Sequence, residues 1–66
     1  MILEIGYYKD KITTFIEVTN VIIHKEKIQI IVIGGEVKTL DLDENDKITI
    51  YDNGVKLFSY KFQLEK

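Results

Sequence analysis

The sequence predicts a single all-β domain over residues 1–66, a small antiparallel meander of six to seven short strands that forms a barrel or a two-layer sandwich. Twelve Ile, five Val and five Thr make one third of the 66 residues β-branched, and such side chains suit a pleated surface. The chain contains no Ala, the best helix former, and no Pro. A chain of this length has room for one hydrophobic core.

The first part of the chain reads as two strands, the second of them long and bent. A strand is expected over 2–8, where apolar residues alternate, and another over 11–18 after a short turn. Thr19 and Asn20 interrupt the pattern. We expect a bulge there rather than a turn, because Asn tolerates the left-handed conformation, and pairing then resumes over 21–23.

The middle of the chain reads as a hairpin. A polar connection over 24–27 precedes the most apolar strand, 28–33. Gly34 and Gly35 predict a tight turn of the primed type, which needs positive φ. A further strand over 36–42 follows this turn.

The last part predicts a second hairpin. A solvated loop over 43–46 leads to a strand over 47–51, and Asn53-Gly54 is the strongest hairpin signal in the chain. The closing strand is expected over 55–64. The residues that alternate on one of its faces are Phe58, Tyr60, Phe62 and Leu64.

The predicted strands carry more apolar residues than one core can bury. In the most apolar strand Ile28 and Ile30 occupy one face, while Ile31 and Ile33 occupy the other. Either this strand is enclosed between layers or shifted by a bulge, or its second face is a contact surface. We expect a contact surface for a protein partner or a second copy, most simply in a homodimer. The residues assigned to this interface are Ile31, Ile33, Ile2, Tyr8 and Leu57.

Catalytic chemistry finds little support in the sequence. The chain has no Cys, so disulfides and thiolate metal sites are excluded. Ser59 is the only serine and His24 the only histidine, and their spacing suggests no nucleophilic arrangement. Arg is absent and the net charge is −2, which argues against duplex nucleic-acid binding. We therefore expect a protein that is not an enzyme and uses no cofactor.

Two alternatives to protein binding remain open. Aromatic residues interleaved with Lys are typical of small β-barrels that bind single-stranded nucleic acid, although alternating aromatics also form core faces. The acidic run that begins at residue 41 resembles the start of a calcium loop, but Asp46 stands where that loop needs Gly. The calcium ligands in this alternative are Asp41, Asp43, Asn45 and Asp52.

The expected location and role follow from small size and the lack of motifs. No signal-peptide pattern is present, and no apolar run approaches the ~20 residues of a membrane helix, so we expect a cytoplasmic protein. The best-supported function is a non-catalytic protein-interaction module. One form of it is a small inhibitor, encoded by a phage or other mobile element, that caps the working surface of a larger protein.

Overall fold

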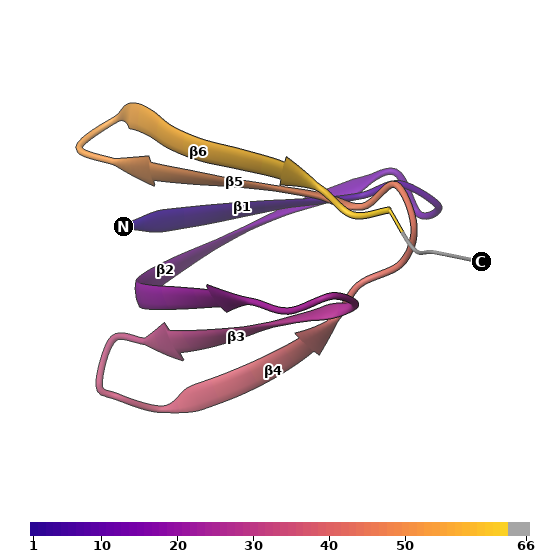
Figure 1. The fold of residues 1–66 in the computed structure, drawn as a ribbon. Coiled ribbons are helices and arrows are strands. Elements are labelled where there is room, and N and C mark those ends of the chain that lie inside the picture. The colour runs from indigo at the N-terminus through magenta and orange to yellow at the C-terminus, as the bar shows by residue number, and fades with distance from the viewer. Residues whose placement is uncertain (64–66) are drawn as a thin grey trace.

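The computed structural model describes residues 1–63, which form one six-stranded antiparallel sheet (Figure 1). The strands are β1 (Ile2–Tyr7), β2 (Ile12–Ile23), β3 (Lys27–Val32), β4 (Val37–Asp41), β5 (Lys47–Asp52) and β6 (Val55–Lys61). Their order across the sheet is β4-β3-β2-β1-β5-β6. In this part of the chain no helix has the length and hydrophobicity needed to cross a membrane.

The all-β class and the antiparallel pairing are confirmed, but the closed barrel and the simple meander are wrong. β5 pairs with β1 rather than with β4, so the chain crosses over between β4 and β5. β4 is a poor neighbour for a buried strand, because Lys38 lies opposite Ile30 on its inner face. In β1, by contrast, the buried Leu3 and Ile5 lie opposite Ile50 and Ile48 of β5. The sheet therefore ends at β4 and β6 and stays open.

The bend in β2 turns this single sheet back on itself. Leu3 of β1 lies opposite Ile16 in the first part of β2, and Ile30 of β3 lies opposite Val21 in the second part. The pairing register shifts at Thr19, which confirms the expected bulge. Because a bulge bends its strand, two halves face each other. The upper half contains β1, β5, β6 and the first part of β2, and the lower half contains the second part of β2, β3 and β4 (Figure 1).

The hydrophobic core fills the space between the two halves. Its buried side chains are Leu3, Ile5, Val18, Ile28, Ile30, Leu42, Ile48 and Phe62. Each such side chain contributes about 1.5–3 kcal/mol relative to an exposed one. The closing strand β6 ends at Lys61 and all its residues are exposed, whereas Phe62, which follows it, is buried. Phe58 and Tyr60 remain 43% and 38% exposed, and Leu64 lies outside the described residues.

One of the two glycine turns differs from its predicted type. Asn53 and Gly54 both have positive φ, 51° and 78°, as the primed turn requires. In the β3–β4 loop the Gly35 N–H donates to the Val32 carbonyl over 3.0 Å, so Ile33 and Gly34 are the central residues. Only Gly34 of this central pair has positive φ, which is the type II pattern. The primed type predicted there is wrong, because the loop is one residue longer than a two-residue hairpin.

Replacing Gly54 with Val is expected to lower the free energy of unfolding by about 2 kcal/mol, since a β-branched residue resists positive φ. Gly6→Ala is the matched control: φ at Gly6 is ordinary, and an added Cβ would meet only the Lys47 carbonyl oxygen, at 3.8 Å. Urea unfolding followed by circular dichroism measures both. Equal loss of stability in the two variants would contradict the turn assignment.

Candidate functional site: the uncovered faces and edges of the sheet

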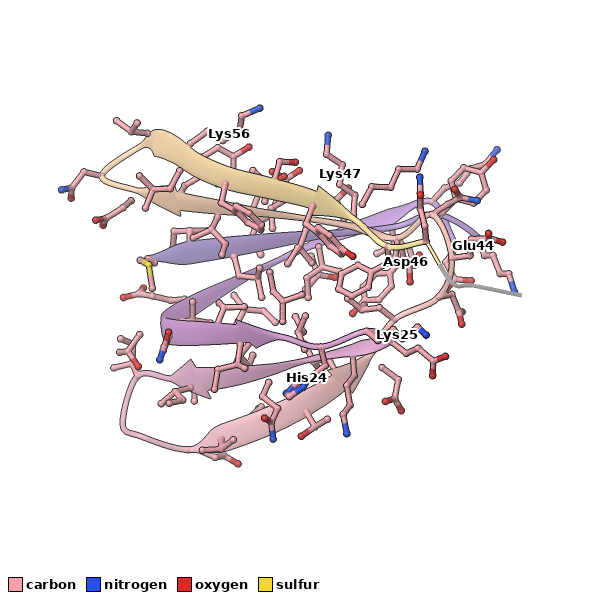
Figure 2. All side chains as sticks on the ribbon, in the orientation of Figure 1. His24, Lys25, Glu44, Asp46, Lys47 and Lys56 are labelled. Atoms are coloured by element: carbon pink, nitrogen blue, oxygen red, sulfur yellow. The ribbon has the colours of Figure 1, made fainter. Side chains whose placement is uncertain are left out.

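The outer face of the upper half is polar and carries three lysines. Register places Lys47 of β5 directly opposite Lys61 of β6, and Thr49 opposite Ser59, with hydroxyl oxygens 3.4 Å apart. Lys56 lies at the other end of the same face, opposite Tyr51. Figure 2 shows Lys47 and Lys56 pointing away from the core. No ion pair joins these three lysines to an acid within residues 1–63, so the β5–β6 side of this face is positively charged.

A shallow depression of about 150 Å³ lies between Lys47 and Lys56. Gly6 and Thr49 contribute to its lining, together with Glu4 and Tyr51. The Tyr51 hydroxyl donates a hydrogen bond of 2.8 Å to Glu4 Oε1. This bond, with smaller contributions from desolvation and from the Glu4 charge, raises the pKa of Tyr51 above its ordinary value of 10.0. The depression suits a small polar group.

The raised pKa of Tyr51 predicts a loss of stability at alkaline pH. Below pH 10.0 the phenol is protonated in both states, and the hydrogen bond contributes fully. Above that value the unfolded chain loses its proton first, so stability falls as the pH rises through the folded pKa. Ultraviolet titration of Glu4→Gln should move the Tyr51 transition down towards 10.0. A transition unchanged from the wild type would contradict the role of Glu4.

The outer face of the lower half is apolar at its centre. Ile31 of β3 lies directly opposite Val37 of β4, and Ile22 of β2 exposes its side chain on the same face. Ile33 follows in the adjoining turn, and like Val37 it is well over half exposed. Nothing in residues 1–63 covers this apolar patch, which consists of Ile22, Ile31, Ile33 and Val37.

The margin of the apolar patch is polar. His24 Nε2 and Gln29 Oε1 lie 2.9 Å apart, and the Thr19 hydroxyl donates to the Ile31 carbonyl over 3.1 Å. Beyond His24, the β2–β3 turn and the end of β4 border an open hollow with acids and lysines in its lining. The mixture of charges there favours no single class of ligand.

The residues predicted for one interface lie in several places. Ile31 and Ile33 belong to the apolar patch of the lower half. Ile2 lies on the outer face of the upper half, opposite Glu17 and Tyr51. Tyr8 lies in the β1–β2 turn, and Leu57 is the extra residue where the β5–β6 register shifts. The structure therefore joins the first two residues and separates them from the other three.

The four residues proposed as calcium ligands do not converge. Asp41 ends β4, and Asp43 and Asn45 lie in the loop that follows. Asp52 ends β5, five residues beyond Lys47 and so about 17 Å along the strand. In the described part of the chain, no cluster of three or more His, Cys, Asp or Glu side chains is arranged to hold a metal ion.

Asp46 has a structural role that the sequence analysis missed. Its side chain is buried, and its carboxylate accepts hydrogen bonds from the backbone N–H groups of Tyr8, at 2.9 Å, and Asp43, at 2.8 Å. Its own carbonyl accepts from the Phe62 N–H at 2.8 Å. Asp46 thus ties the β1–β2 turn, the β4–β5 loop and the end of the closing strand together (Figure 2).

Comparisons with protein-family models, with curated proteins and with solved structures give no match for this chain.

Proposed function

We propose that this chain is a non-catalytic protein-interaction module that binds a protein partner through the apolar patch of the lower half. The observation that carries the proposal is that Ile31 lies directly opposite Val37 and diagonally from Ile22 on one uncovered face. Contiguous exposed apolar side chains on a soluble domain mark interaction sites.

The arrangement of the patch supports this proposal. An apolar centre with a polar margin is the usual anatomy of a protein–protein interface, and Thr19, His24 and Gln29 supply the margin here. A rigid sheet presents such a patch with little loss of side-chain freedom, because β-branched residues have few rotamers. A module of this kind inhibits a larger protein by capping its working surface.

A matched pair of variants tests the proposal. Val37 and Val55 are both valines with exposed fractions of 57% and 60%, but only Val37 belongs to the patch. Proteins captured from the native host by immobilised wild type, Val37→Lys and Val55→Lys are compared by quantitative mass spectrometry, and the captured partner is then titrated in purified form. We expect Val37→Lys to weaken binding at least tenfold and Val55→Lys to leave it unchanged.

Circular dichroism first establishes that both variants are folded. Identical capture by the two variants, or loss of the partner with Val55→Lys alone, would show that the patch is not the binding surface.

A second candidate function is single-stranded nucleic-acid binding on the outer face of the upper half. Lys47, Lys56 and Lys61 favour it, whereas Glu4 and Glu17 on the same face oppose it. Three phosphate contacts predict a plot of log affinity against log salt with a slope of about −2. Fluorescence anisotropy with a labelled single strand measures this slope. No binding at about 50 mM salt would exclude the function.

A further inference from the structure

The inner face of β6 is left uncovered by the lower half. All seven residues of β6 are exposed, although Phe58 and Tyr60 lie opposite the inner-facing Ile50 and Ile48. The rings of Phe58 and Tyr60 are stacked with centroids 6.5 Å apart, and Tyr60 meets the buried Phe62 edge-on at 4.9 Å. The upper half has four strands and the lower half three, so the row of aromatic rings begins in the core and ends at the open edge.

β6 is also the less protected of the two sheet edges. An edge strand presents unpaired backbone N–H and C=O groups, and natural proteins blunt such edges with short strands or inward-pointing charges. β4 has both devices, since it has five residues and carries Lys38 on its inner face. β6 has seven residues and no charge on its inner face beyond the bulge at Leu57. Its regular segment, 58–61, is therefore open to another strand.

We propose that two copies of this chain pair edge to edge through β6, antiparallel, around a two-fold axis at Ser59. A two-fold axis perpendicular to the sheet leaves the inner faces of both copies on the same side. The upper halves of the two copies then form one continuous sheet. With Ser59 on the axis, Phe58 of each copy lies opposite Tyr60 of the other. Two aromatic cross-strand pairs then cover the rings that the lower half leaves exposed.

Charge disfavours the register that is shifted by two residues along the strand. With Ser59 on the axis, Lys61 of each copy lies opposite the apolar Leu57 of the other. An axis at Lys61 would place two ammonium groups directly opposite each other, which destabilises a strand pair. A second copy therefore suits this edge, because it supplies the aromatic partners without opposing lysines.

The surface area that each copy can bury at this edge limits the affinity of the dimer. A standard interface takes about 800 Å² from each partner, roughly one sixth of the 4688 Å² surface of this chain. One strand edge and two half-exposed rings per copy supply less than that. We therefore expect a weak dimer that forms at high micromolar concentration. It uses the opposite half from the apolar patch and does not depend on the proposed function.

Cysteine cross-linking tests the axis directly, because the chain contains no Cys. Residues on the axis of an antiparallel pair lie about 4.5–5.5 Å apart at Cα, within the range of a disulfide. Under mild oxidation we expect Ser59→Cys to form covalent dimer at least tenfold faster than Thr13→Cys, an exposed position on the outer face of β2. Equal rates in the two variants would overturn the proposal.

Analytical ultracentrifugation gives an independent readout. The wild type should show a dimer at high micromolar concentration, Phe58→Lys should weaken it at least tenfold, and Ile33→Lys, in the apolar patch, should not. A wild type that stays monomeric, or a dimer lost with Ile33→Lys alone, would overturn the proposal. If Phe58→Lys does not fold, the cross-linking rates decide. Because these measurements use purified protein alone, their failure leaves the partner-capture result untouched.

Discussion

Replacing Asp46 with alanine is expected to lower the free energy of unfolding by about 3 kcal/mol. The buried carboxylate accepts two backbone hydrogen bonds, from Tyr8 and Asp43, and its removal leaves both donors without their partner. A core of this size supplies only about 3–5 kcal/mol, so the variant should be largely unfolded at ambient temperature. Urea unfolding followed by circular dichroism measures the loss.

Asp43→Ala is the control for this prediction. Asp43 lies in the same loop with an exposed side chain, and it contributes its backbone N–H rather than its carboxylate to the contact with Asp46. We expect a change within about 0.5 kcal/mol, as for most surface substitutions. If the Asp46 and Asp43 variants were equally stable, the carboxylate would not hold the three segments together.

Replacing Phe62 with alanine is expected to cost about 3–5 kcal/mol, because it opens a cavity in the core. Phe62 is completely buried and meets Tyr60 edge-on. Phe58→Ala removes the same atoms, but at a position of β6 that is 43% exposed. We expect this control to lose about 1 kcal/mol in denaturant unfolding. Similar losses in both variants would contradict the finding that Phe62 is buried and Phe58 is partly exposed.

Local chemistry made several features of the fold predictable. Asn53-Gly54 needs positive φ at two successive residues, and Thr19-Asn20 interrupts an alternating pattern without the length of a loop, so both features follow from neighbouring residues. The β1–β5 pairing depends on residues 41 positions apart at Gly6–Lys47 and 49 positions apart at Ile2–Tyr51. No turn specifies such a pairing. The pairing depends on which free edge, β1 or β4, presents the more apolar inner face to β5.

The candidate surfaces were predictable only in part for the same reason. Alternation placed Phe58 and Tyr60 on one face, which the register confirms, but alternation does not tell how far the opposite half extends over that face. Asp46 read as a solvated loop acid because its partner Tyr8 is 38 residues away. The surplus of apolar residues in 28–33 did identify the uncovered face that carries Ile31.

The crossover between β4 and β5 also predicts the order in which the strand pairs form during folding. Strands β1 to β4 pair with their sequence neighbours, so their ladders close over short loops, and the β5–β6 hairpin closes over Asn53-Gly54. Only the β1–β5 ladder joins these units through the sheet, and its loop closes last because its entropic cost is greatest. Folding should therefore be limited by docking of a preformed hairpin onto β1. The amide protons of that one ladder should exchange in a single cooperative opening, separate from those of the bent β1–β4 unit.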